Sequence, residues 1–132
     1  MVCMHHWARG QRGEQAPLPE SQLQRSSRKK ARDIRRCQQF SHEACGREFT
    51  YWLEQDGYAH PGGCWGAGEN LAWGTGELGT VRSILTAWVY SPDHLANMLT
   101  ASFDHFGVSM EVGSLNGYAD AHIWVTHFGA LC

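Results

Sequence analysis

The feature that most constrains the fold is a change in the period of apolar residues near position 105. Before it, apolar residues recur every three or four positions, which is typical of helices packed on one side. After it, residues 106–112 alternate apolar and polar, and residues 121–128 are rich in β-branched and aromatic side chains. Asn116-Gly117 between them is a strong tight-turn signal. We therefore expect helices first and an antiparallel hairpin last, in an α+β fold.

The helical part divides into segments separated by glycine and proline. In the longest segment, Leu23, Ser27, Ala31 and Ile34 form one narrow buried stripe beneath a basic face. A hairpin alone is only marginally stable, so we expect a third strand at 66–73. No internal repeat or domain boundary interrupts the 132 residues, which predicts a single domain. The expected helices span residues 1–9, 21–38, 48–55, 80–90 and 92–99.

Charge is distributed unevenly along the chain. Seven of the eleven lysines and arginines lie within residues 25–36, whereas ten acidic residues accompany only two basic ones from Cys37 onward. The acidic remainder argues against a surface that wraps nucleic acid, and no nucleic-acid partner is expected. We interpret the basic window as a solvated helix face; a specific anionic partner, such as a cell-wall polymer, a lipid headgroup or nucleic acid, is the alternative. No apolar run approaches the roughly 20 residues of a transmembrane segment.

The cysteines indicate an oxidising compartment. Cys3, Cys37, Cys45, Cys64 and Cys132 match no CxxC motif, which predicts disulfides with one thiol left over. The first ten residues lack the apolar core of a secretory signal, so we expect an upstream signal segment to be missing; reduced cysteines are the alternative. A Cys3–Cys132 bridge would tie the two ends together, worth up to about 5 kcal/mol in the chain-entropy model.

Three polar residues lie at the ends of expected elements rather than on amphipathic faces, namely His42, Glu69 and His94. Two imidazoles and one carboxylate are a ligand set for Zn²⁺, with water in the fourth position. Each residue also has an ordinary structural interpretation, at a helix end or as a backbone cap. If His42 and Glu69 share a cleft, then Cys45 and Cys64 lie close together and form the second predicted disulfide.

Five short blocks follow one another along the chain: Phe40-Ser41-His42, GENLAWG at 68–74, WVYSPDHLANML at 88–99, FGV at 106–108 and WVTHFG at 124–129. Their order and spacing resemble the CAP superfamily of cysteine-rich secretory, antigen 5 and plant pathogenesis-related proteins, and in particular its bacterial branch. The resemblance extends over about residues 1–129. It implies a single domain over 1–132, built as a three-layer α-β-α sandwich with a central antiparallel sheet and a central cleft.

The resemblance also implies which residues line that cleft. In the superfamily, the residues that match His42, Glu69 and His94 line the cleft and in some members hold a divalent metal. A divalent metal, zinc or another, is therefore the cofactor implied here. Asn70 and Asn97 belong to the same blocks and are expected beside the three.

Three positions depart from the family pattern. Leu95 replaces the arginine that usually follows the third-block histidine, and Ser91 stands where animal members carry a second acidic cleft residue. His127 occupies the place of an aspartate in bacterial relatives, either as an extra ligand or as a surface substitution. The family's four-residue constellation is therefore incomplete.

The resemblance implies a secreted, extracellular protein whose His/Glu cleft binds a divalent metal or a small ligand, with a lipid or a cell-envelope component as possible partners. We expect a binding module rather than an enzyme. Neither a GxSxG elbow nor a Walker loop is present. Two alternatives stay open: a metal-dependent hydrolase acting on peptide or cell-envelope bonds with Glu69 as general base, and a structural extracellular or spore-surface protein.

Overall fold

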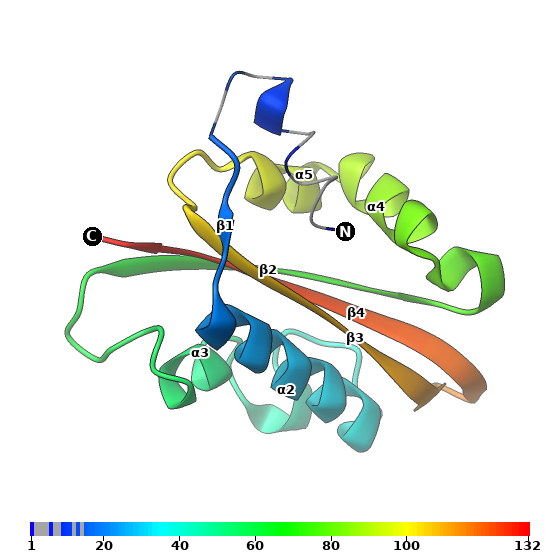
Figure 1. Cartoon of the computed structure of the whole chain (residues 1–132). Helices are drawn as coiled ribbons and strands as arrows, with labels where there is room; N and C mark the ends of the chain where they lie inside the picture. Colours follow the sequence, from blue (N-terminus) through cyan, green and yellow to red (C-terminus); the bar gives the residue numbers. More distant parts are fainter. Residues whose placement is uncertain (2–5, 7–8, 12, 14) are drawn as a thin grey trace.

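A computed structural model describes residues 1, 6, 9–11, 13 and 15–132 (Figure 1). The predicted helix over 1–9 lies largely outside these residues. The other predicted helices and strands are confirmed, with ends that shift by at most three residues. In chain order the elements are β1 (Leu18–Pro19), α2 (Ser21–Cys37), η1 (Ala44–Gly46), α3 (Tyr51–Gln55), β2 (Trp65–Gly74), η2 (Gly76–Gly79), α4 (Val81–Val89), α5 (Pro92–Leu99), β3 (His105–Leu115) and β4 (Tyr118–Leu131).

The elements form three layers around one sheet. The strand order is β1-β3-β4-β2, with β3 and β4 as the predicted antiparallel hairpin and β2 as the predicted third strand, antiparallel to β4. The short β1 pairs with β3 in parallel. Helices α2 and α3 cover one face, and α4 and α5 cover the other (Figure 1). This confirms the α+β sandwich.

Helix α2 can lie close against the sheet because a glycine faces it. A Cβ atom on Gly107 of β3 would come within 2.2 Å of the main chain of Leu23 and Gln24. The helix begins at Glu20, whose carboxylate accepts from the Gln22 N–H, and ends at Gln38 in the left-handed conformation. The predicted stripe of Leu23, Ser27, Ala31 and Ile34 is fully buried.

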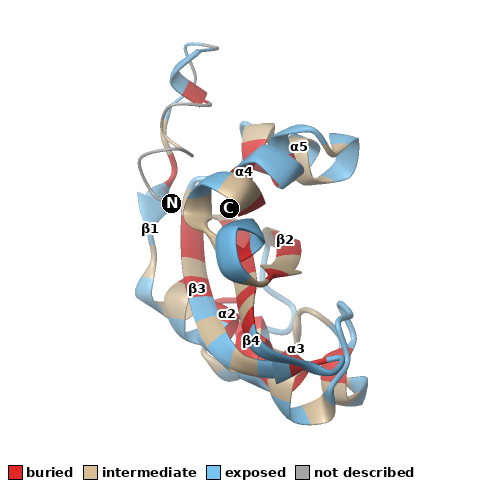
Figure 2. Cartoon of the chain, turned by 90° about the vertical axis from the view of Figure 1, so that its right-hand side faces the viewer, coloured by how far each residue is buried: buried red, intermediate tan, exposed pale blue. Residues whose placement is uncertain are grey.

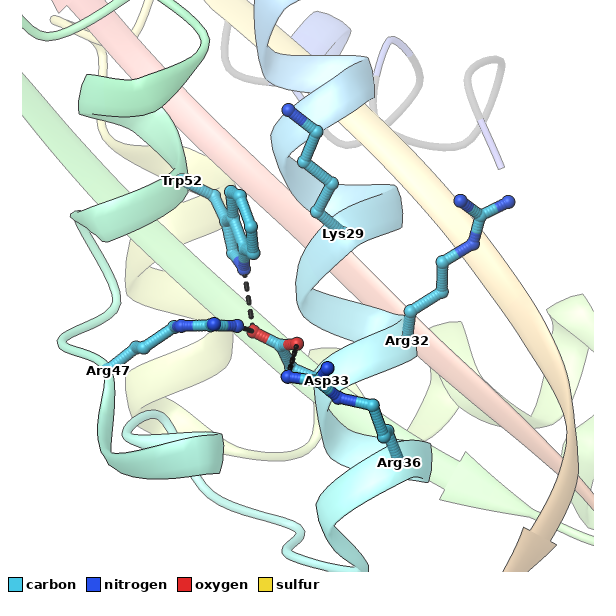
Figure 3. Close-up of a pocket in the computed structure, with 6 residues that line it drawn as sticks. All are labelled: Lys29, Arg32, Asp33, Arg36, Arg47 and Trp52. Carbon is cyan, nitrogen blue, oxygen red and sulfur yellow. Dashed lines mark hydrogen bonds and ion pairs between the residues drawn. The ribbon is translucent and has the colours of Figure 1, made fainter.

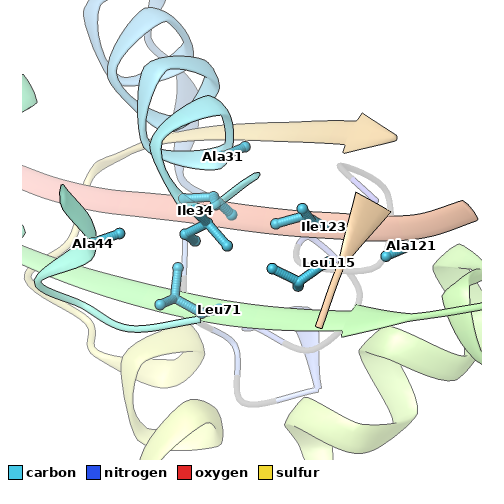
Figure 4. Close-up of a cluster of buried hydrophobic side chains, with 8 residues drawn as sticks. Ala31, Ile34, Ala44, Leu71, Leu115, Ala121 and Ile123 are labelled. Atoms are coloured by element: carbon cyan, nitrogen blue, oxygen red, sulfur yellow. The ribbon is translucent and has the colours of Figure 1, made fainter. Parts of the chain in front are cut away.

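Alternation along β4 sends side chains into both helical layers. Ile123 and Val125 pack against α2 in the apolar cluster of Figure 4, whereas Phe128 packs with the residues of α4 and α5. Buried residues gather along the strands and on the helix faces turned toward them (Figure 2). Of the described helices, none is long and apolar enough to cross a membrane.

The structure contains two disulfides, and both predicted pairings are wrong. Cys64 bonds to Cys132 because the β2–β4 register places Trp65 opposite Leu131 and so brings the flanking residues together. Cys45 bonds instead to Cys37, across the short segment that follows α2. Cys3, the predicted partner of Cys132, lies outside the described residues.

Candidate functional site

Glu69 of β2 lies at the centre of the site, with a side chain only 2% exposed. Both of its carboxylate oxygens are engaged. His42 donates from Nδ1 to Oε1 over 2.6 Å, and His127 donates from Nε2 to Oε2 over 2.8 Å. His127 stands opposite Glu69 in the register of β4 against β2. One buried carboxylate therefore joins a histidine of a loop to a histidine of the sheet.

A buried lysine approaches the same carboxylate from the helical layer. Lys30 of α2 places Nζ 4.0 Å from Glu69 Oε1 and donates to the main-chain carbonyl of His42. Burial lowers the pKa of Lys30, while the charges of Glu69 and Asp33 offset part of that effect. Lys30 thus connects the loop of His42 to both the helix and the buried carboxylate.

A polar chain continues inward from His127, which is fully buried. Ser26 of α2 has its Oγ 2.7 Å from His127 Nδ1 and 3.0 Å from the carbonyl oxygen of Leu23. Ser26, His127, Glu69 and His42 therefore form one hydrogen-bonded series, which we call the polar chain. It leads from the core to the surface, where the His42 side chain is 59% exposed.

Charges within the polar chain stabilise one another. Burial alone would raise the pKa of Glu69, but hydrogen bonds from His127 and His42, together with nearby positive charge, bring that pKa below its ordinary value. The hydrogen bond to Glu69 raises the pKa of His42, against the opposing effects of partial burial and Lys30. Because Nδ1 of His42 is held by the carboxylate, Nε2 is the ring atom left for a ligand.

Two asparagines link α5 to the strand that carries Glu69. Asn97 donates from Nδ2 to the main-chain carbonyl of Glu69 at 3.2 Å and to Oδ1 of Asn70 at 2.9 Å. Asn70 in turn donates to the main-chain carbonyl of His94 at 3.0 Å. The asparagine pair therefore fixes the position of α5, and with it His94, relative to the buried carboxylate.

His94 is held by two residues that precede its helix, Ser91 before α5 and Trp88 of α4. Its Nδ1 lies 2.7 Å from Ser91 Oγ, and its ring stacks on Trp88 at a centroid distance of 6.3 Å. Burial and the neighbouring charge of His42 lower the pKa of His94. In the part of the chain that the structure describes, Nε2 of His94 has no hydrogen-bond partner, as is also true of Nε2 of His42.

A cavity of about 320 Å³ opens beside this cluster, lined by His42, Phe49, Gly68, Glu69 and Asn97. A Cβ atom on Gly68 would lie 3.0 Å from both Asn97 Oδ1 and the Phe103 ring, so a side chain here would press on Asn97 and on Phe103. His42, Glu69 and Asn97 therefore line one cavity, whereas the other two candidate residues, Asn70 and His94, are not among its lining residues.

The fold is similar to those of three bacterial proteins of known structure. An outer surface protein from Borrelia burgdorferi has a TM-score of 0.80 at 16% identity, covering 99% of this chain and 90% of that one. An extracellular protein with an SCP domain from Bacillus anthracis has a TM-score of 0.78 at 18% identity, covering 98% and 38%. A cysteine-rich secretory protein from Staphylococcus aureus has a TM-score of 0.60 at 12% identity, covering 96% and 37%. No curated protein matches the chain by sequence.

Residues 4–128 match the cysteine-rich secretory protein family, CAP. The chain belongs to the CAP family. This match confirms the resemblance drawn from the five sequence blocks, and the structural neighbours confirm the CAP-type sandwich. The CAP domain spans almost the whole chain, but only about two fifths of the Bacillus anthracis and Staphylococcus aureus proteins.

The donor atoms of this CAP domain test the predicted metal set. Among the described residues, no group of three or more His, Cys, Asp or Glu side chains is arranged to hold a metal ion. Glu69 is buried with both oxygens engaged, so it fits the role of an outer partner that orients His42 better than that of a direct ligand. The imidazoles of His42 and His94 are each held through Nδ1, so each ring has its Nε2 atom left as a donor to a metal ion.

Sequence reasoning missed two members of the site, Lys30 and Ser26, and left a third, His127, open between an extra ligand and a surface substitution. His127 lies on the same face of β4 as Ile123 and Val125, so strict alternation could have identified it as buried. The sequence did not identify Lys30 and Ser26 as site residues, because a lysine in a basic window and a serine in a polar helix are typical of a solvated face. Their burial depends on how α2 rotates against the sheet, which no local pattern reports.

Proposed function

We propose that this chain is an extracellular CAP domain that acts as a binding module and takes up a divalent cation at the imidazoles of His42 and His94. The observation that carries the proposal is that each Nδ1 has an internal partner, Glu69 for His42 and Ser91 for His94. An imidazole oriented in this way presents Nε2 to a metal, and a carboxylate behind it strengthens the ligand. A bound cation would act as a Lewis acid toward a small ligand in the cavity beside His42.

The extracellular assignment is supported by covalent chemistry. Two disulfides are typical of chains that fold in oxidising compartments. The similar structures include an outer surface protein and an extracellular protein, which agrees with this assignment.

Binding is a better fit than hydrolysis with Glu69 as general base. A general base must reach the proton that it removes from water or substrate. The Glu69 carboxylate is 2% exposed and already accepts two hydrogen bonds, so it is positioned to orient His42. A hydrolytic version of this site would need His42 as its base.

Calorimetric titration of the oxidised chain with ZnCl₂ at neutral pH tests the proposal. We expect saturable binding that is lost when His42→Ala and His94→Ala are combined, and that weakens roughly 10- to 100-fold in Glu69→Gln, because the outer carboxylate is lost. His60→Ala, at an exposed histidine outside the site, is the matched control and should bind as the wild type does. Absence of binding in the wild type, or equal binding in the double variant, would overturn the proposal.

A further inference from the structure

A second pocket lies on the outward side of α2 and shares no lining residue with the cavity beside His42. Its volume is about 300 Å³, and Figure 3 shows the side chains around it. They come from α2, from the loop after η1 and from α3. The lining residues are Lys29, Arg32, Asp33, Arg36, Arg47 and Trp52.

Positive charge exceeds negative charge in this pocket. Asp33 accepts from Arg47 at 2.6 Å and from the Trp52 indole N–H at 2.8 Å, and it lies 3.5 Å from Arg36 (Figure 3). A single carboxylate therefore faces two guanidinium groups. Asp33 offsets one of the two positive charges, so one net positive charge remains on this group of three side chains.

The neighbouring ion pairs also leave an excess of positive charge. Lys29 and Arg25 share Asp56, at 2.5 and 4.0 Å, and Arg32 lies 3.9 Å from Glu111. Arg35 binds Glu111 more closely, at 3.0 Å. In this network of pairs, six cations share three carboxylates, namely Arg25, Lys29, Arg32, Arg35, Arg36 and Arg47 with Asp33, Asp56 and Glu111.

Two of the cations, Lys29 and Arg47, are oriented by Trp52 before any ligand arrives. Arg25, Lys29, Arg32 and Arg36 recur at steps of four, three and four, so they form a stripe along one side of α2. Arg47 stands with Cζ 4.9 Å from the centre of the Trp52 ring, and Lys29 stands with Nζ 5.0 Å from it. These cation–π contacts orient the two groups and reduce the entropy that binding must cost.

We propose that this pocket binds a tetrahedral oxyanion, the phosphate or sulfate group of an ester. Guanidinium groups present planar pairs of N–H donors that match the oxygens of such a group, and two or more of them converge here. The volume exceeds that of the oxyanion alone and leaves room for the start of the organic part beside Trp52. Such a group is carried by a soluble phosphorylated sugar or by a phospholipid headgroup.

The first experiment is an NMR titration of the oxidised chain with sodium phosphate and with sodium sulfate, at constant ionic strength kept with NaCl. We expect saturable shifts of the Trp52 indole N–H and of the α2 amides. Combined Arg32→Gln and Arg36→Gln should weaken binding about tenfold or more, because charged hydrogen bonds are lost. Both side chains are more than 60% exposed, so the fold should be retained.

A charge-matched variant distinguishes binding in the pocket from nonspecific attraction of the anion to the positive charges on the protein surface. Combined Arg28→Gln and Arg82→Gln removes the same two charges from exposed positions outside the pocket, and we expect an effect of about twofold or less. Equal weakening in the two double variants, or no saturation above the chloride background, would overturn the proposal.

Two further experiments distinguish whether the phosphate group comes from a soluble ester or from a lipid headgroup. Glucose 6-phosphate is titrated as the soluble ester, and phosphatidylcholine vesicles with and without phosphatidylinositol 4-phosphate are tested by co-sedimentation. Binding in either arm that the pocket variant loses and the charge-matched variant keeps supports the proposal and names the source. Binding that both variants keep would place the ligand elsewhere.

Discussion

At the scale of single residues, Glu69 illustrates how a charge can be kept inside a protein. A buried carboxylate is costly unless hydrogen bonds and opposite charge replace its hydration. Here His42 and His127 each donate to one oxygen, and Lys30 adds a positive charge. Each partner comes from a different element, so the carboxylate also holds the loop, the sheet and α2 in register.

Removing His127 should destabilise the fold more than its size suggests. His127→Ala leaves an oxygen of Glu69 without its partner in the core and leaves the Ser26 hydroxyl with the Leu23 carbonyl alone. We expect a loss of about 3–5 kcal/mol in the free energy of unfolding. Urea denaturation followed by circular dichroism measures it. The control is His122→Ala on the same strand, where the half-buried ring makes one 3.3 Å contact with Gly79. Similar losses in the two variants would contradict the role assigned to His127.

The raised pKa of His42 predicts how stability depends on pH. In the folded chain Glu69 stabilises the protonated imidazole, so this contribution is complete below the ordinary pKa of 6.5 and is lost as pH rises through the higher folded value. The difference in unfolding free energy between the wild type and His42→Gln should therefore shrink as the pH rises from below 6.5 through the higher folded pKa. A difference that grows with pH would show that the neutral ring is the form that Glu69 favours.

The sequence identified part of this site and missed the rest for a physical reason. His42, Glu69 and Asn97 stand in short blocks whose order marks the family, so they could be named as candidates, and they line one cavity; Asn70 and His94, named with them, do not line it. Lys30 and Ser26 belong to no such block, and they join the site only because α2 turns their side chains toward the sheet. His127 was predicted as either an extra ligand or a surface substitution; it is buried and acts as a hydrogen-bond partner of Glu69.

At the scale of elements, α2 performs two tasks with its two sides. Its buried side supplies Ser26 to the polar chain and Lys30 beside it, while its outer side carries Arg32 and Arg36 of the second pocket. The periodicity of apolar residues predicted the helix and its buried stripe correctly, because amphipathic period is a local property. The division of its polar residues between core and solvent is a tertiary property and could not be predicted in the same way.

The close seat of α2 on the sheet yields a test. Gly107→Ala would place a methyl group within 2.2 Å of the helix main chain, so either the helix or the strand must move. We expect a loss of about 3 kcal/mol or more in the free energy of unfolding, at the upper end of overpacking costs. Gly10→Ala, where nothing lies within 4 Å of the new Cβ, is the control. Equal stability of the two variants would show that α2 is not seated as described.

The two disulfides should contribute unequally to stability. Cys64–Cys132 closes 68 residues, whereas Cys37–Cys45 closes only 8. In the chain-entropy model these loops are worth about 4 and about 2.5 kcal/mol. Thermal unfolding of the paired Cys→Ser variants measures the difference. A larger loss on removal of Cys37–Cys45 would indicate that the segment with His42 stabilises the fold beyond its loop entropy.

At the scale of the whole molecule, the order of elements was predictable and the disulfide connectivity was not. Helices followed by a hairpin, with an additional strand from the glycine-rich segment, allow few arrangements other than helices on both faces of one sheet. The cysteine pairing depends on strand register, since Cys64 and Cys132 meet because β2 pairs along its length with residues His122–Leu131 of β4. A family and a fold host many activities, so the function rests on the site alone.

The two ends of the polar chain should differ in how often they open to solvent. His127 is fully buried on β4, which lies between β3 and β2 in the sheet, so its amide should exchange with solvent only when the whole domain unfolds. His42 lies in the segment after α2, secured by one disulfide and by Lys30, so its amide should exchange through smaller local openings. A ligand that enters the cleft would therefore meet a floor that is rigid for the lifetime of the fold and a rim that can adjust around it.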